Sequence, residues 1–383
     1  MQIITQNDQL EEFADHAIAS DFLCVDTEFM RESTFYSQLC LIQAATPDRE
    51  CIIDPLADGL DLEPLLELLA DERLQKVMHS ARQDLEIFYE IMGEVPAPLF
   101  DTQIAAMALG YGDSVGYQAL VKGELGRKLD KGARFTDWSR RPLSERQLEY
   151  AIGDVTHLRD LYPGMVRKLE AKGRTAWIEE ETAPMLDPSL YENDPEQAWK
   201  RLKIRSPKVR HLAALKAAAA WRERQAIERD IPRRRVLKDD AIYAIAQAQP
   251  TSVEALGKVR GVPNGFERSK NGRALVDALK TALDDADSYA PPAPEHRHKP
   301  PNIGPTVEML RTLLRLRTEY EDIAPRLVAN AADIESIAAF GEKADVAALR
   351  GWRREVFGKD ALDMMAGKIG LRLEDREVVA KRL

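Results

Sequence analysis

The chain has 383 residues, of which 44% are hydrophobic, and this length and composition predict a globular protein of two or three domains. Its 54 lysines and arginines against 64 aspartates and glutamates give a net charge of −10, which taken alone argues against a protein that binds polyanions. The N-terminus lacks the basic and apolar regions of a signal peptide, and no apolar stretch is long enough to span a bilayer. We therefore expect a cytoplasmic protein with no membrane partner.

Residues 1–169 alternate apolar, strand-like runs with amphipathic, helix-like stretches, which predicts an α/β domain. The strand-like runs are FLCVDTEF, LCLIQAAT, ECIID and KVMHS, and the helix-like stretches include LEPLLELLAD and ARQDLEIFYEIM. Cys24, Cys40 and Cys51 lie in the apolar runs without the spacing of a zinc site. We expect them to be buried, reduced thiols.

Acidic residues in this domain form a pattern that indicates metal binding. Asp26 and Glu28 in VDTEF are two residues apart on a predicted strand, so their side chains share a face. Asp84 follows in HSARQDLEIF, and Tyr150 and Asp154 share one face of the helix predicted for LEYAIGDVTHL. Carboxylates held so close repel one another unless cations neutralise them, and their hard oxygen atoms favour Mg²⁺ or Mn²⁺. The pattern predicts a pair of divalent metal ions.

Beyond this domain the composition changes from mixed to helical. A charged, helical connection is expected at 170–206, and almost every segment of 207–286 has apolar residues at helical spacing. Residues 287–305 are dense in proline and predict an extended linker, after which 306–383 repeats the helical layout.

Basic residues gather in Lys200–Arg210 and Arg229–Arg235, and such local patches decide phosphate contacts more than the net charge does. For Arg233, Arg234 and Arg235, phosphate binding and a plain solvated surface are equal alternatives. The chain has no GxxxxGK[ST] loop, so we expect no nucleoside triphosphate partner, and a helicase is excluded.

These motifs resemble those of the DEDD exonucleases, in the subclass that has a tyrosine in the third motif. DTEF matches the first motif, HSARQDLEIF the second and YAIGD the third. The resemblance extends to the ribonuclease D family through FYSQLCLIQ, DTQIAAMALG and FTDWSRRPLSERQLEYA. Ser37 departs from the pattern, because a proline is expected there in relatives, but it lies outside the metal ligands.

The helical half resembles the HRDC domain that RecQ helicases and ribonuclease D share. The match in 207–286 rests on Leu215, Trp221, Arg222, Ala226, Asp230, Pro232, Val236, Leu237, Asp240 and Ile245. The stretch IAPRLVANAADIESIA makes 306–383 resemble a second HRDC domain. The implied fold class is therefore α/β plus all-α: a ribonuclease H-like 3′→5′ exonuclease domain with a mixed sheet, followed by two small helical HRDC-like domains.

The resemblance also implies roles for the site residues. Asp26 would bridge two metal ions, Glu28 and Asp154 would complete the site of the ion that activates water, and Asp84 would serve the ion at the leaving 3′ oxygen. Tyr150 would orient the attacking water, because a phenol is a poor base at neutral pH.

The sequence also gives expectations for residues near these motifs. Phe29 is expected to stack against terminal bases, with a place in the core as the alternative. His79 is expected either to contact a phosphate or terminal nucleotide or to be structural. Trp138 and Arg141 are expected to brace the third-motif helix, and Trp221 to lie in a helical core.

The implied function is that of a metal-dependent 3′→5′ exoribonuclease that releases 5′-mononucleotides from structured RNA precursors such as transfer RNA. The HRDC-like domains would hold the body of the RNA while the exonuclease domain trims its end. A 3′→5′ DNA exonuclease is the nearest alternative, because the same carboxylates cut either polymer. A nucleic-acid-binding scaffold without catalysis is a further alternative, against which the intact carboxylates and Tyr150 argue.

Overall fold

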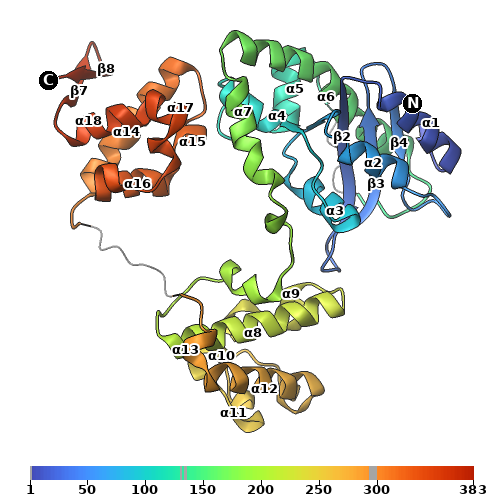
Figure 1. Ribbon diagram of the computed structural model, residues 1–383, viewed down its shortest axis with the longest axis vertical. Helices are drawn as coiled ribbons and strands as arrows, with labels where there is room; N and C mark the ends of the chain where they lie inside the picture. Colours follow the sequence, from blue (N-terminus) through green and yellow to red (C-terminus); the bar gives the residue numbers. More distant parts are fainter. Residues whose placement is uncertain (1, 130–131, 133–135, 293–299) are drawn as a thin grey trace. The chain divides into compact units, whose positions relative to one another are not determined.

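A computed structural model describes residues 2–129, 132, 136–292 and 300–383 of the chain (Figure 1). These residues form two compact units. One comprises 1–28, 40–190 and 298–383, and the other comprises 29–39 and 191–297. The linker predicted at 287–305 includes 293–299, which lie outside the described residues. Among the residues described, no helix is both long and apolar enough to cross a membrane.

A mixed sheet of six strands forms the centre of the first unit. Its strands are β1 (Gln2–Ile4), β2 (Phe22–Met30), β3 (Gln38–Ala45), β4 (Glu50–Ile53), β5 (Gln75–Met78) and β6 (Leu99–Asp101). Their order is β1-β4-β3-β2-β5-β6, with β3 and β4 antiparallel and the pairs β1–β4, β2–β5 and β5–β6 parallel. All four strand-like runs are confirmed. Strands β1 and β6 have only three residues each, too few for an alternating pattern to be visible.

Helices of the first unit connect and cover these strands. They are α1 (Asn7–Ala17), α2 (Glu63–Ala70), α3 (Arg82–Met92), α4 (Thr102–Ala108), α5 (Tyr117–Leu125), α6 (Glu145–Ala171) and α7 (Thr175–Thr182), with the short turns η1 (Ala183–Leu186) and η2 (Pro188–Leu190). Helix α6 begins at a capping box, in which Ser144 and Gln147 satisfy each other's backbone N–H groups. This cap fixes the end of α6 nearest Tyr150.

Packing of β2 against α6 sets the direction in which the acidic residues point. Phe22 and Cys24 lie in one buried apolar cluster with Val155 and Leu158 of α6. Because side chains alternate along a strand, the side chain of Asp26 points to the same face of β2 as those of Phe22 and Cys24, just beyond the apolar cluster. The three cysteines are free and buried, as the sequence predicts.

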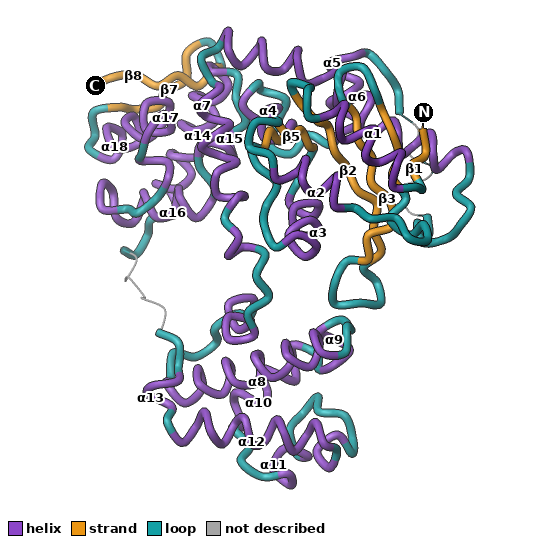
Figure 2. Tube along the Cα trace, turned by 45° about the vertical axis from the view of Figure 1, so that its right-hand side comes forward, coloured by secondary structure: helices purple, strands orange, loops and turns teal. Residues whose placement is uncertain are grey.

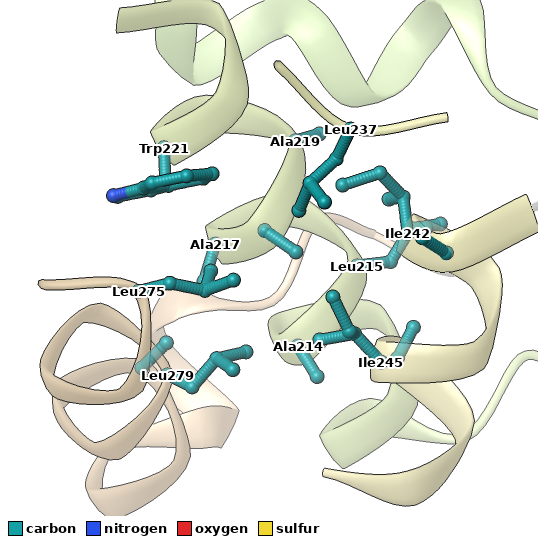
Figure 3. Close-up of a cluster of buried hydrophobic side chains, with 14 of the residues drawn as sticks. Ala214, Leu215, Ala217, Ala219, Trp221, Leu237, Ile242, Ile245, Leu275 and Leu279 are labelled. Atoms are coloured by element: carbon teal, nitrogen blue, oxygen red, sulfur yellow. The ribbon is translucent and has the colours of Figure 1, made fainter. Parts of the chain in front are cut away.

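The second unit is helical around a core that α8 dominates (Figures 2 and 3). Its elements are η3 (Pro195–Arg201), α8 (Val209–Glu228), α9 (Arg233–Val236), α10 (Asp239–Ala248), α11 (Val253–Gly257), η4 (Phe266–Arg268), α12 (Lys270–Asp284) and α13 (Ala286–Tyr289). Leu215 and Trp221 of α8 pack with Ile245 of α10 and Leu279 of α12 (Figure 3). The prediction that Trp221 lies in the core is confirmed.

The C-terminal segment repeats part of this layout. Its elements are α14 (Gly304–Glu321), α15 (Pro325–Val328), α16 (Ala331–Phe340), η5 (Gly341–Lys343), η6 (Ala347–Leu349), α17 (Gly351–Arg353), η7 (Arg354–Gly358), α18 (Lys359–Met365), β7 (Ile369–Glu374) and β8 (Glu377–Arg382). In both repeats an aspartate with positive φ follows the long helix: Asp230 (44°) is the second residue after α8, and Asp322 (52°) comes directly after α14. A helix of four residues and a helix of ten then follow. The hairpin β7–β8 differs from the helical plan expected for the whole of 306–383.

The C-terminal repeat packs tightly within the first unit. Leu327 of α15 belongs to the same buried apolar cluster as Leu109 and Val121. The indole rings of Trp177 and Trp352 stack, with their centroids 3.9 Å apart. These contacts make the repeat part of the body that carries the sheet.

Candidate active site

Three of the predicted ligands come together at the end of β2. Asp26, Glu28 and Asp154 each offer a carboxylate oxygen, and these three atoms all lie within 4.8 Å of one another. All three residues are partly buried. Strand alternation places the first two on one face, and the packing of α6 brings Asp154 to it. Oxygen atoms so arranged suit a hard divalent cation.

Helix α6 carries both members of the third motif, Tyr150 and Asp154. Tyr150 and Asp154 are one turn apart on α6, and the Tyr150 ring centroid lies 6.1 Å from that of Trp138. Trp138 is 2% exposed, so it supports Tyr150 from the protein interior.

Tyr117, which the sequence reasoning did not single out, also holds this part of α6. Its hydroxyl donates to the backbone carbonyl oxygen of Asp154 at 2.5 Å and lies 3.2 Å from that of Gly153. Burial, followed by the nearby charges of Asp154 and Asp26, raises the pKa of Tyr117 well above its usual range. The hydroxyl therefore stays protonated and remains a donor. Tyr117 and Asp154 are 37 residues apart, so no local sequence pattern joins them.

Asp84 lies on α3 and is linked to β2 by a side-chain hydrogen bond. Its carboxylate is buried and accepts a hydrogen bond from the hydroxyl of Thr27, the residue between Asp26 and Glu28, at 2.5 Å. Burial raises the pKa of Asp84 to about 6, while the hydrogen bond from Thr27 opposes the rise. Asp84 is not one of the three residues whose oxygens cluster within 4.8 Å.

The turn before α3 is fixed by Asp101. Its buried carboxylate accepts backbone N–H groups from Ser80 at 3.0 Å, Ala81 at 2.9 Å and Gln103 at 2.8 Å. Because Ala81 directly precedes α3, this carboxylate helps to place Asp84. Asp101 thus has a structural role beside the site, as a carboxylate with satisfied hydrogen bonds.

The four carboxylates repel one another in the absence of cations. Burial, followed by the charges of Asp154, Asp84 and Glu28, raises the pKa of Asp26 well above its usual range. The three neighbouring carboxylates therefore lie near enough to Asp26 to act on it, Asp84 included. A divalent cation would relieve both the repulsion and the cost of burying these charges. The donor set therefore fits a metal site.

His79 and Phe29 are the two residues that the sequence predicts to bind substrate. Nδ1 of His79 lies 3.0 Å from the hydroxyl of Thr102, which donates to the carbonyl oxygen of Met78 at 3.1 Å. Burial lowers the pKa of His79, so its ring is neutral near pH 7 and offers no positive charge to a phosphate. These contacts favour the structural alternative for His79. Phe29 is partly exposed near the end of β2.

Arg141 braces the loop before α6. Its guanidinium donates to both carboxylate oxygens of Asp54 at 2.6 Å and to the carbonyl oxygen of Cys40 at 2.7 Å. It also donates to the carbonyl oxygen of Trp138 at 2.8 Å. Arg141 therefore ties this loop to the sheet, in line with the expected bracing role.

Family comparisons match two parts of the chain. Residues 1–170 match the family described as 3′-5′ exonuclease, and residues 211–279 match the HRDC domain. The first match contains every carboxylate of the cluster.

Whole-length relatives cover nearly the entire chain. Ribonuclease D of Nitrobacter hamburgensis is 46% identical over 379 residues, covering 99% of this chain and 99% of the relative. Ribonuclease D of Sphingobium indicum is 45% identical over 382 residues, covering 97% and 96%. The crystal structure of RNase D from Escherichia coli, described as an exoribonuclease involved in structured RNA processing, has a TM-score of 0.80 at 29% identity. It covers 96% of this chain and 98% of that one.

Proposed function

The chain belongs to the ribonuclease D family and is a 3′→5′ exoribonuclease, and from that premise we propose that it trims the 3′ ends of structured RNA precursors such as transfer RNA. Its products would be 5′-mononucleotides. The observation that carries the proposal is the cluster of three carboxylate oxygens within 4.8 Å, on the domain that matches the exonuclease family.

The cluster is the proposed place of divalent metal ions, with Mg²⁺ or Mn²⁺ as the natural ones. Asp26, Glu28 and Asp154 would hold one ion, and Asp26 with Asp84 would hold a second. Bound there, the ions would supply the positive charge that lowers the pKa of water and stabilises the leaving oxygen of a phosphodiester. Burial and the neighbouring carboxylates together raise the pKa of Asp26, which supports this assignment, because a bound cation would offset both effects.

Other residues of the chain would position the reactants. The Tyr150 hydroxyl would hydrogen-bond and orient the attacking water, with Trp138 behind its ring. The ring of Phe29, partly exposed next to Glu28, would stack on the terminal bases. A contact of His79 with RNA would have to be made by a neutral ring whose Nδ1 lies 3.0 Å from the Thr102 hydroxyl.

The HRDC-like domains would hold the body of the RNA. We keep as a proposal the division into exonuclease domain (1–169), connection (170–206), first HRDC domain (207–286), linker (287–305) and second HRDC-like domain (306–383). In the first HRDC domain the side chain of Arg234 is 80% exposed and pairs with Asp239 at 3.3 Å, so phosphates can reach it, whereas Arg233 is paired with the buried Glu223. Arg233 therefore has a structural role, because it neutralises the buried Glu223 carboxylate.

A competition assay tests the substrate. Transfer-RNA precursor carrying a 3′ extension, unstructured RNA and DNA of matched sequence would be mixed with the purified full-length chain and followed by product size. We expect stepwise loss of mononucleotides from the RNA 3′ ends and preferential trimming of the precursor. Equal degradation of the DNA strand would favour a DNA exonuclease instead. Indifference to the precursor would reject transfer RNA as the substrate.

A further inference from the structure

The segment that follows the metal site is anchored on the first HRDC domain. Residues 29–39 comprise the end of β2, the loop after it and the start of β3. They belong to the same compact unit as 191–297. Phe35 is 3% exposed and lies in the buried apolar cluster that contains Trp221 and Leu237. A residue of the connection between β2 and β3 thus forms part of the core of the HRDC domain.

Asp230 fixes the backbone of this anchor. One carboxylate oxygen of Asp230 accepts the N–H groups of Phe35 at 2.9 Å and Tyr36 at 3.1 Å. Asp230 has a φ of 44°, in the left-handed region, where aspartate is tolerated better than most residues. The turn after α8 therefore aims this carboxylate at two adjacent amides.

Arg233 covers the ring of the same anchor. Its guanidinium carbon lies 4.3 Å from the centroid of Phe35. Glu223, whose side chain is 1% exposed, accepts from Nε and Nη2 of Arg233 at 2.6 Å each, which holds the guanidinium over the ring. Because the ion pair has two points of contact, it fixes the orientation of the Arg233 guanidinium as well as its position.

We propose that Asp230 and Arg233 are positioning residues for the nuclease reaction, acting through Phe35 on the strand end that carries Glu28 and Phe29. The inference rests on the proposed role of Glu28 as a metal ligand. A connection anchored at Phe35 limits fraying of the last residues of β2. Small displacements of reacting groups have large effects on rate. The HRDC domain therefore affects the cleavage rate even for an RNA that is too short to contact this domain.

The C-terminal repeat has an aspartate at the corresponding place after its long helix, with different contacts. Asp322, the equivalent of Asp230, accepts from Nζ of Lys172 at 3.0 Å. Gly110 has a φ of 86°, and a Cβ there would overlap the Asp322 side chain, so the glycine allows the close approach. The carbonyl oxygens of Glu321 and Asp322 accept from the buried Arg174. In both repeats the aspartate that follows the long helix accepts a hydrogen bond from a segment within the first 190 residues.

Substitutions at Asp230 test the proposal in the full-length chain. Asp230→Gly removes the acceptor without backbone strain, whereas Asp230→Asn keeps an acceptor oxygen and tolerates positive φ. Asp375→Gly is the matched control, because Asp375 has a φ of 48° in the exposed turn between β7 and β8. Each variant would be compared in single-turnover cleavage of a short, unstructured RNA and in hydrogen exchange of residues 29–39.

We expect Asp230→Gly to cleave the short RNA about 10- to 100-fold more slowly, with faster exchange of the Phe35 and Tyr36 amides. Asp230→Asn and Asp375→Gly should stay close to wild type in both measurements. A wild-type rate for Asp230→Gly on the short RNA overturns the inference, and so does a loss confined to structured RNA, which would indicate an RNA contact instead. If the wild-type chain fails to cleave RNA, the proposed function fails, and the exchange measurement still reports on the anchor.

Discussion

The hydroxyl of Thr27 donates a hydrogen bond to the carboxylate of Asp84, and this contact joins α3 to β2 at the residue between Asp26 and Glu28. Thr27 is 6% exposed and Asp84 is 7% exposed, so water does not readily replace the bond. The proposed ligand on α3 is therefore held by the very strand that supplies two other ligands.

Removing that hydroxyl should weaken metal binding. Thr27→Val keeps the shape of the side chain but removes this one donor to Asp84, which should raise the pKa of the Asp84 carboxyl further. We expect the Mg²⁺ concentration for half-maximal activity to rise about 10- to 100-fold, as for other losses of a hydrogen bond to a ligand. Thr27→Ser should restore most of the affinity, and Thr281→Val, on the exposed face of α12, should have no effect. An unchanged metal requirement in Thr27→Val would contradict this account.

Tyr150→Phe should slow the chemical step without greatly weakening RNA binding. The phenyl ring keeps the packing against Trp138 but cannot hydrogen-bond to water. We expect single-turnover rates to fall roughly ten- to a thousandfold, with dissociation constants nearly unchanged. Tyr320→Phe is a suitable control, because Tyr320 is 83% exposed on α14. Equal single-turnover rates for Tyr150→Phe and wild type would remove this tyrosine from the mechanism.

The stability of the metal-free protein should depend on pH through the acidic cluster. Burial raises the pKa of Asp84 to about 6 and, with neighbouring carboxylates, that of Asp26 well above its usual range. Because the folded state then binds protons more tightly than the unfolded state, the free energy of unfolding falls as pH rises from about 4 through about 6. Divalent cations bind the deprotonated carboxylates and offset this loss.

Thermal unfolding with and without Mg²⁺ measures this linkage. We expect the increase in Tm on adding Mg²⁺ to be larger at about pH 8 than at about pH 5, where protons compete with the metal. In Asp26→Asn the increase should be small at both pH values. An increase of the same size at both pH values in the wild type would argue against these residues as ligands.

The C-terminal repeat should contribute to the stability of the first unit. Trp352→Ala removes the stack on Trp177 and the ring that lies 4.4 Å from the guanidinium carbon of Arg353. We expect the free energy of unfolding to fall by about 2 kcal/mol. Leu373→Ala, at a side chain that is 71% exposed, should change it by less than about 0.5 kcal/mol. A value for Trp352→Ala as small as that of the control would show that the repeat is only loosely attached.

Short-range periodicity predicted the core of the site. The alternation in FLCVDTEF placed Asp26 and Glu28 on one face of a strand, and helical spacing joined Tyr150 to Asp154. The buried cysteines and Trp221 followed from their apolar surroundings. In each case the physical cause lies within a few residues of the position that was predicted.

Contacts between segments far apart in the sequence could not be predicted from local periodicity. Tyr117 holds α6 over 37 residues, Thr27 meets Asp84 over 57, and Phe35 meets Asp230 over 195. Each depends on which surfaces the fold brings together, and that information is absent from local patterns. The hairpin β7–β8 was missed because a helical layout was extended to the chain end, although Glu377–Arg382 is rich in β-branched valine.

Cleavage of 5′-labelled RNA by the wild type and by Asp84→Asn tests the central claim most directly, because it links this cluster to metal-dependent removal of 3′ nucleotides. The substitution removes one negative charge from a proposed ligand and changes little packing. With Mg²⁺ we predict a ladder shortening from the 3′ end for the wild type, its loss with chelator and its return when Mg²⁺ is restored. Asp84→Asn should remain folded and inactive, while Asp15→Asn, at an exposed position of α1, should behave as the wild type. Near wild-type cleavage by folded Asp84→Asn, or activity that persists in chelator, would contradict the account.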